Sequence, residues 1–218
     1  MVPFTILQKS RINNLKRSNC ERAMLYNNIT DAIGQTPIIK INNLFSHPNV
    51  VLYGKLEASN PGGSVKERIA LSMIESGEKS GELTRDKIVL EATSGNTGIG
   101  LAMVCAAKGY RCQLIMPESA SIERRKIMKA YGAEIILTPA QKATDGAIEK
   151  SYAMVREFPD RYFLTDQYNN DANWKAHYYA TGPEIWNQTE GEVTHIVATL
   201  GTSGTVMGLC AYFQKHHP

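Results

Sequence analysis

The chain has 218 residues, of which 43% are hydrophobic and 21% charged, with 17 glycines and 9 prolines. This is the composition of an ordinary globular protein, and it excludes intrinsic disorder, collagen-like repeats and coiled coils. The net charge of +3 is concentrated in residues 1–23, which hold five basic residues and one acidic residue. The rest of the chain is nearly neutral and does not predict a groove for a nucleic acid backbone.

The N-terminal segment predicts neither a secretory signal nor a membrane span. Its apolar run at residues 2–7 precedes the basic residues, which reverses the order found in a signal peptide. No apolar run approaches the roughly 20 residues that a membrane-spanning helix needs. We expect residues 1–23 to be a basic extension that is disordered or not native, with Met24 as the functional start. A transit peptide is the alternative, because the segment has almost no acidic residues.

Cysteine usage indicates a reducing compartment. The four cysteines show no CxxC spacing and are too few for the disulfide framework of a small secreted domain. Cys105 and Cys210 fall inside apolar helical patterns, so we expect both to be buried free thiols. A cytoplasmic location follows from this expectation.

From about residue 50 the sequence alternates short β-rich runs with helical patterns. The predicted strands are 50–56, 87–91, 112–116, 134–137, 162–164 and 195–200, and the helices that follow them are 64–77, 96–108, 122–131, 144–158, 173–187 and 205–215. The strand runs are continuously apolar, which is typical of strands buried on both faces of a parallel sheet. The alternation predicts an α/β fold with helices on both sides of an open parallel sheet.

Two turns rich in glycine and hydroxyl groups lie where predicted strands end and helices begin. They are residues 93–98 and residues 201–205. Backbone N–H groups and the helix dipole converge at such junctions, and Ser and Thr hydroxyls add donors, so either turn can hold an anion. The alternative is that they serve only as tight turns and helix caps. Gly95, Gly98 and Gly100 are spaced GxxGxG, which disfavours a dinucleotide site.

A third feature is the Pro-Gly-Gly turn at residues 60–63, which leads into a helix with Ser64 as its predicted N-cap. Lys66 lies in the first turn, where the positive end of the helix dipole disfavours a cation. We interpret Lys66 as an amine that forms a Schiff base with an aldehyde and so loses its charge; an ordinary surface lysine is the alternative. Such a lysine and two anion-binding turns are the parts that a pyridoxal phosphate site needs.

Five motifs carry a resemblance to a known family. In chain order they are NPGGSVKERIALSMI, EATSGNTGIGLAM, MPESASIERRKIMKAYGAE, TGPEIW and THIVATLGTSGTVMG. They resemble the cysteine synthase family, enzymes with the tryptophan-synthase-β-like (type II) pyridoxal phosphate fold, and are most similar to its B-type members. The resemblance runs from about Tyr26 to Gln214. It implies two open, mostly parallel sheets flanked by helices, with the second domain incomplete.

The resemblance also implies site residues. Lys66 would be the Schiff-base lysine and the base that moves the substrate α-proton, and Asn96 would bind the ring hydroxyl of pyridoxal 5′-phosphate. The substrate carboxylate would bind to Thr93, Ser94, Gly95, Thr97 and Gln167. The cofactor phosphate would bind to Gly201, Thr202, Ser203, Gly204 and Thr205, with Ser203 standing where the family usually has Gly or Thr. No metal site is expected; His177 is expected to pack in the core, and His195 to be a core or sheet-end histidine.

The activity implied is a β-replacement, a transferase reaction of cysteine biosynthesis. O-acetylserine would lose its acetate to give an aminoacrylate, and sulfide or thiosulfate would add at Cβ to give L-cysteine or S-sulfocysteine, with ping-pong kinetics. The alternatives are a cystathionine β-synthase-like enzyme and a non-catalytic remnant that acts as a binding module. The resemblance implies small-molecule substrates, no nucleic acid or membrane partner, and a homodimer in the full-length family.

Family members are longer than this chain, so the resemblance implies C-terminal truncation. We expect residues 60–165 to form the smaller N-terminal α/β domain, with a mobile part that closes over substrate. Residues 24–59 and 166–218 would form an incomplete domain that binds the cofactor phosphate. Strand 195–200 would then lack neighbours and leave apolar surface uncovered, so we expect the chain to be unstable or inactive alone.

Overall fold

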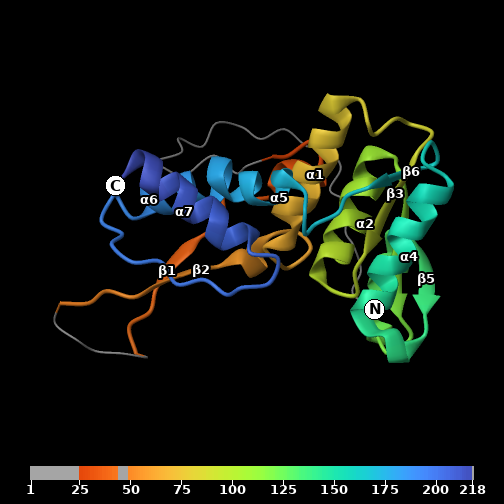
Figure 1. The fold of residues 1–218 in the computed structure, drawn as a ribbon. Coiled ribbons are helices and arrows are strands. Elements are labelled where there is room, and N and C mark those ends of the chain that lie inside the picture. The colour runs from red at the N-terminus through yellow and green to blue at the C-terminus, as the bar shows by residue number, and fades with distance from the viewer. Residues whose placement is uncertain (1–24, 44–48, 218) are drawn as a thin grey trace, which may run out of the picture.

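The computed structural model describes residues 25–43 and 49–217. The expectations for residues 1–23 and for Met24 therefore lie outside the described residues. A four-stranded sheet with its helices occupies one end of the molecule, and an antiparallel pair of short strands with further helices occupies the other (Figure 1). In the part of the chain that is described, no helix is both long and apolar enough to cross a membrane.

The main sheet is parallel and has the strand order β5-β4-β3-β6. Its strands are β3 (Ile88–Ala92), β4 (Arg111–Pro117), β5 (Glu134–Thr138) and β6 (Tyr162–Leu164). Every residue of β3 is buried, as the continuous apolar run predicted for a strand covered on both faces.

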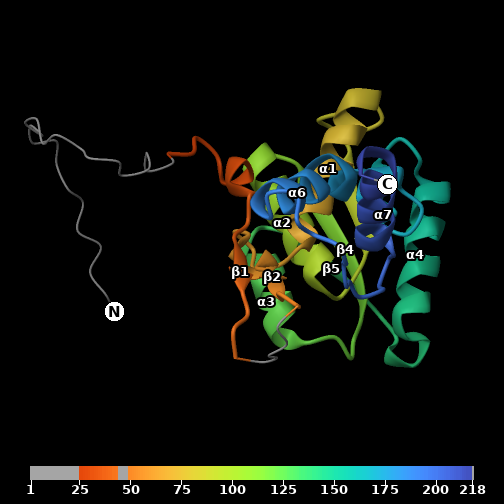
Figure 2. The same cartoon turned by 90° about the vertical axis from the view of Figure 1, so that its left-hand side faces the viewer.

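Helices cover both faces of this sheet (Figure 2). On one face Val89 and Leu114 pack in a core formed with α1 (Lys66–Ser80), α2 (Asn96–Lys108) and α3 (Ile122–Ala130). On the other face Leu90 and Ile115 pack with Ala147 and Met154 of α4 (Ala143–Glu157). Because side chains alternate along a strand, the two cores arise from neighbouring residues of β3 and β4. The α/β class is thereby confirmed.

The remaining elements flank α1. Strands β1 (Ile38–Lys40) and β2 (Tyr53–Lys55) form a separate antiparallel pair. The helices at this end are α5 (Asp171–Ala176), α6 (Gly182–Gln188) and α7 (Gly204–His216), with short helical turns η1 (Ile29–Ala32), η2 (Glu57–Ser59) and η3 (Ala140–Lys142) elsewhere.

Helices α5 and α6 are joined by a π-helical segment, η4 (His177–Thr181). The Gly182 N–H donates to the carbonyl of His177, five residues back, where an α-helix would use four. The predicted helix 173–187 is therefore one continuous run with a single widened turn.

Most predicted elements match the structure to within a few residues, and helix 96–108 matches α2 at both ends. The predicted strand 195–200 is wrong, since no residue from 192 to 203 belongs to a strand. Val197 is 97% exposed and Leu200 76% exposed, and His195 is exposed instead of packed in a core. A strand forms only against a neighbour, and among the described residues none pairs with this segment.

The cysteine expectation is confirmed in part. Cys105 is buried and free, as expected, and so is Cys112. Cys210 is also free but lies exposed on α7, so the prediction that it is buried is wrong. It borders an apolar groove of about 760 Å³ between α7 and the segment that follows α6, because that segment does not pack down as a strand.

A buried ion-pair network fixes the start of α1. The guanidinium of Arg68 lies 2.7 Å from a Glu57 oxygen and 2.7 Å from a Glu184 oxygen, and its side chain is 3% exposed. Lys55 on β2 adds a second ion pair to Glu184 at 2.7 Å. One side chain of α1 is thus tied to η2 and to α6, which are 127 residues apart between Glu57 and Glu184.

We expect Arg68→Ala to lower the free energy of unfolding by about 3–5 kcal/mol, because it leaves the Glu57 carboxylate without its ion-pair partner and Glu184 with Lys55 alone. Lys175→Ala is the matched control. It removes the exposed ion pair with Asp171, which should contribute less than about 1 kcal/mol. Denaturant-induced unfolding measures both, and equal losses in the two variants would contradict the importance of the network.

Candidate active site

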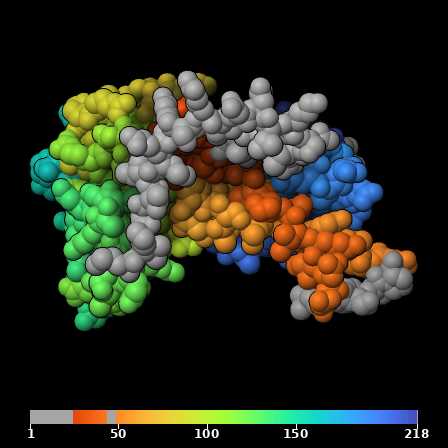
Figure 3. Space-filling model, turned by 180° about the vertical axis from the view of Figure 1, so that it is seen from behind, coloured from red at the N-terminus to blue at the C-terminus, as the bar shows by residue number. Residues whose placement is uncertain are grey.

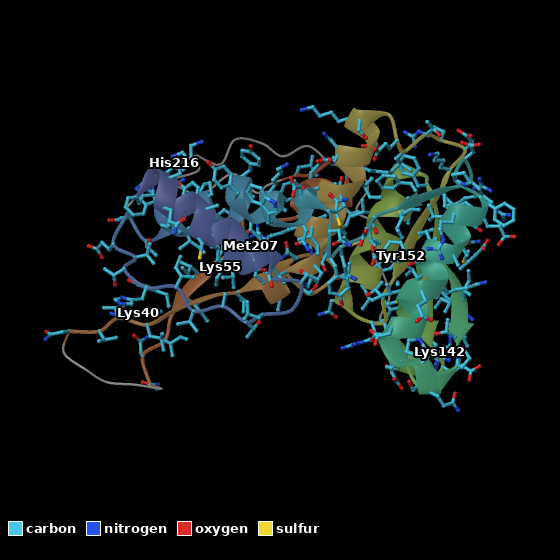
Figure 4. The ribbon with its side chains drawn as sticks, viewed as in Figure 1. Lys40, Lys55, Lys142, Tyr152, Met207 and His216 are labelled. Atoms are coloured by element: carbon cyan, nitrogen blue, oxygen red, sulfur yellow. The ribbon has the colours of Figure 1, made fainter. Side chains whose placement is uncertain are left out.

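The starts of α1, α2 and α7 form the candidate active site. The two predicted turns, residues 93–98 and 201–205, lead into α2 and α7. Seen from behind, the outline of the molecule is hollowed below the orange segment that leads from β2 into α1 (Figure 3). Met207 of α7 and Tyr152 of α4 lie on opposite sides of the region where α1 and α5 meet the sheet (Figure 4).

The first turn is shaped to leave backbone donors available. Thr93 is buried, and its Oγ1 accepts a hydrogen bond from the Gly95 N–H at 3.3 Å. No side chain caps the first turn of α2, so the positive end of its dipole faces the turn. Ser94 is half-buried and Asn96 is exposed. The guanidinium of Arg124 on α3 reaches the Ser94 carbonyl at 3.4 Å.

Gln167 meets this turn, as predicted. Thr97 Oγ1 donates to Gln167 Oε1 at 2.8 Å, across 70 positions of sequence. Gln167 is itself held by Glu91 at the end of β3, since its Nε2 donates to Glu91 Oε1 at 3.1 Å and its backbone N–H donates to Glu91 Oε2 at 3.3 Å. The Thr165 hydroxyl also donates to Glu91 Oε2. These bonds form a relay that consists of Thr97, Gln167 and Glu91.

Glu91 is a functional candidate that the sequence reasoning missed. It is 2% exposed. Burial raises the pKa of its carboxyl to about 7, against the opposing effect of its hydrogen bonds to Thr165 and Gln167, and the nearby charge of Asp166 adds to the rise. The signal in the sequence was an acidic residue at the end of an otherwise apolar strand.

The second turn leads into α7 and is joined to the first. Asn173 Nδ2 donates to Thr202 Oγ1 at 2.9 Å and to the Gln167 carbonyl at 2.7 Å. Ser203 has a left-handed backbone with φ 64°, which favours glycine and costs a serine about 1 kcal/mol. Gly204 is required where it stands, because a Cβ there would overlap Asn173 Oδ1.

His177 packs against the second turn and contacts its last residue, Thr205. It is fully buried, and its ring nitrogens contact the hydroxyls of Thr181 at 3.0 Å and Thr205 at 3.2 Å. Burial lowers the pKa of His177 to about 4, and the positive charges of Arg68 and Lys66 contribute. The expectation that His177 packs in the core is confirmed, but its contact with Thr205 was missed. It lies four residues after Asn173, so one helix face carries both contacts to the turn.

Lys66 is the first residue of α1, and its backbone N–H donates to Ser64 Oγ at 3.1 Å. Burial lowers the pKa of its amine. Within residues 25–43 and 49–217 no carboxylate lies within ion-pair distance of this amine, although neighbouring Arg68 has two. α1 and α2 pack closely here, since a Cβ at Gly100 would lie 3.2 Å from the Lys66 carbonyl.

Side-chain hydrogen bonds thus bring four of the predicted residues into two connected groups. Thr97 and Gln167 are linked through Asn173 to Thr202, and Thr205 is linked to His177. The side chains of Lys66 and Asn96 make no hydrogen bond to either turn within the described chain, and Gly201 has open space around it.

The sequence is similar to a known family model and to known proteins of that family. A sequence model described as "Pyridoxal-phosphate dependent enzyme" matches residues 29–218. Cysteine synthase from Aquifex aeolicus is 48% identical over 193 residues, which are 87% of this chain and 59% of that protein. Cysteine synthase B from Salmonella typhimurium is 47% identical over 189 residues, or 87% of this chain and 62% of that protein.

A solved structure agrees with this. The crystal structure of cysteine synthase from Entamoeba histolytica superposes with a TM-score of 0.86 and 40% identity, covering 94% of this chain and 62% of that one. The chain therefore spans about three fifths of the length of the curated relatives it matches.

Glu91→Gln should change how stability depends on pH. Because the folded pKa is above the ordinary value, the folded state binds the extra proton, and Glu91 loses its stabilising contribution as pH rises from about 4.5 to about 7. The lowered pKa of His177 has the opposite effect, since it makes the protein more stable as pH rises from about 4 to 6.5. The two effects oppose each other, so the unfolding free energy of wild type alone changes little with pH in this range. The difference between variant and wild type should grow by up to about 3 kcal/mol over the Glu91 range. The measurement is urea unfolding at several pH values, and a free-energy difference between variant and wild type that does not change with pH would contradict this prediction.

Gly204→Ala and Gly201→Ala form a second matched pair. The added methyl at 204 overlaps Asn173 and should destabilise the protein by about 1–3 kcal/mol, whereas the same methyl at 201 meets nothing. Inorganic phosphate should raise the melting temperature of wild type and Gly201→Ala but not of Gly204→Ala. Equal phosphate stabilisation in both variants would show that the second turn holds no phosphate.

Proposed function

The chain belongs to the pyridoxal-phosphate dependent enzymes, and from this premise we propose that it carries out β-replacement on O-acetylserine. Sulfide would yield L-cysteine, and thiosulfate would yield S-sulfocysteine. The observation that carries the proposal is that two helix-start turns are joined through Gln167 and Asn173 beside a half-buried lysine whose pKa is lowered. One turn suits a substrate carboxylate and the other a phosphate ester.

The residues at the start of α7 fit the phosphate of this cofactor. No side chain caps the helix, and no acidic residue stands in its first turn. A Cβ at Gly201 would meet nothing within 4 Å, so the turn leaves room for a ligand beside its backbone. Residues 201–205 would hold the phosphate, Asn96 the ring hydroxyl, and Lys66 Nζ the aldehyde carbon. When bound, the cofactor supplies an electron sink for the carbanion at the substrate Cα.

Lys66 would act as the base. Because burial lowers the pKa of its amine, a larger fraction is neutral near pH 7 than for an exposed lysine, and a neutral amine can accept the substrate α-proton. The absence of a carboxylate partner in the described residues keeps the amine from being held as a cation. Neighbouring Arg68 takes the available carboxylates instead.

Residues 93–97 and Gln167 would orient the amino acid. The uncapped start of α2 favours an anion, and the hydroxyls of Thr93, Ser94 and Thr97 can donate to carboxylate oxygens. A carboxylate held there fixes the Cα of the substrate relative to Lys66, which is the requirement for proton transfer.

The proposal includes the division of the chain expected from its sequence. Residues 60–165 would form the smaller domain with a part that closes over substrate, and residues 24–59 with 166–218 part of the domain that binds the cofactor phosphate. We further propose a cytoplasmic enzyme that acts on small molecules as a homodimer.

The test compares wild type with Lys66→Ala after incubation with pyridoxal phosphate and dialysis. Wild type should keep the visible absorption band of a lysine-bound cofactor, and the variant should lose it and form cysteine at least about a hundredfold more slowly. Lys142→Ala, at an exposed lysine, is the control and should keep the band. A band retained in Lys66→Ala would overturn the lysine assignment. No band in wild type would favour a non-catalytic remnant.

A further inference from the structure

The hydrogen bonds of the Thr97–Gln167–Glu91 relay all run in one direction. Thr97 donates to the oxygen of the Gln167 amide, and the nitrogen of that amide donates to Glu91. An ionised carboxylate can only accept hydrogen bonds, so it holds the amide nitrogen toward β3 and the amide oxygen toward Thr97. The Thr97 hydroxyl hydrogen is then used inside the relay and is not offered to a ligand in the turn.

A neutral Glu91 permits the reverse direction. Its Oε2 already accepts from Thr165 and from the Gln167 backbone, whereas Oε1 contacts only the Gln167 side chain. A proton on Oε1 could donate to the amide oxygen after the amide turns by 180°, which changes its shape very little. The amide nitrogen would then face Thr97 and release its hydroxyl to donate into the turn.

The local backbone holds the relay at this point. Asp166, between Thr165 and Gln167, has φ 46°, and its carbonyl accepts the backbone N–H groups of Asn169 and Asn170. This left-handed turn allows residues on both sides of Asp166 to bond to the same carboxyl group. The side chain of Asp166 faces away from the relay and accepts from Tyr152 on α4 at 2.9 Å.

The charged surroundings set the range in which Glu91 titrates. Asp166 raises its pKa by like charge, and Tyr152 on α4 is hydrogen bonded to Asp166. β4 places the apolar Leu114 beside Glu91. On the face covered by α1, the ionisable groups at the helix start are Lys66, Glu67 and Arg68; Glu67 is bonded to Ser64, and Arg68 is paired with Glu57 and Glu184. With burial as the largest cause, the pKa of about 7 lies in the physiological range.

We propose that Glu91 is a proton-controlled positioning residue: a proton on Glu91 reverses the Gln167 amide and thereby prepares the turn at 93–97 to bind a carboxylate. This inference rests on the proposed function, because it takes that turn as the site of the amino acid carboxylate, and it adds the regulation of the site. By linkage, carboxylate binding and protonation of Glu91 favour each other.

The experiment titrates the isotopically labelled 218-residue chain with propionate and follows binding by NMR. Propionate stays ionised from pH 6 to 8.5, so its own titration does not contribute to the pH dependence of binding. It has no amine and therefore cannot bind by forming a bond to the cofactor. The wild-type dissociation constant should rise about fivefold or more across this range. Glu91→Gln, which carries a donor at every pH, should bind with the same affinity throughout.

Asp166→Asn is the matched control. Asparagine tolerates the left-handed backbone, and the change removes the neighbouring negative charge together with one of the oxygens that accept from Tyr152 and Asn169, neither of which belongs to the relay. The variant should keep the pH dependence of propionate binding but shift its midpoint to lower pH. An Asp166→Asn variant that loses the dependence, or a Glu91→Gln variant that keeps it, would overturn the assignment to Glu91.

A readout within wild type covers the case in which Glu91→Gln does not fold. The side-chain amide resonances of Gln167 should shift with the same midpoint as the Glu91 carboxyl resonance, and the absence of that shift would overturn the proposal. Propionate that binds at no pH would overturn it as well. Cofactor uptake is measured separately, so a pH-dependent propionate site in a chain that takes up no cofactor would refute only the proposed function.

Discussion

The position of α1 depends on one buried guanidinium. Arg68 is the third residue of α1, and its two carboxylate partners come from η2 on one side and α6 on the other. A buried charge tolerates little displacement of its partners, so these contacts fix the helix start in both directions. Because Lys66 lies two residues before Arg68 in the same helix, these contacts also fix the backbone of Lys66. Arg68 also contributes to the lowered pKa of His177, so the same charge helps to keep the support of the second turn neutral.

The two turns behave as one unit because the side chains of Gln167 and Asn173 and one backbone carbonyl connect them. The Gln167 side chain contacts Thr97 in the first turn, and the Gln167 backbone carbonyl accepts a hydrogen bond from Asn173. The side chain of Asn173 also donates to Thr202 in the second turn. Buried networks of this kind are rigid when every member is satisfied. The exception is Asn173 Oδ1, which has no partner in the described chain and lies beside the start of α7. This oxygen accepts hydrogen bonds and cannot bind an anion, so only a hydrogen-bond donor could complete the network there.

Local sequence patterns were sufficient for the elements but not for the contacts between them. The bounds of α2 could be predicted because Gly95 and Gly109 flank an uninterrupted apolar helix. The role of Glu91 could not, since it depends on Gln167, which lies 76 positions later. The strand expected at 195–200 failed for the same reason, because β-propensity acts only when a partner strand is present. Function at this site lies in pairings that no short window of sequence contains.

The widened turn at His177–Thr181 sets the rotational phase of everything after it. Each residue of an α-helix advances the side chains by about 100° around the axis. The additional residue allows Asn173 and His177 to face the second turn while Glu184 faces Arg68 on another side. Deleting one residue here would give a more regular helix and turn Glu184 away from Arg68 by about 100°. The irregular turn is therefore what lets a single helical run contact both the second turn and the buried ion pair.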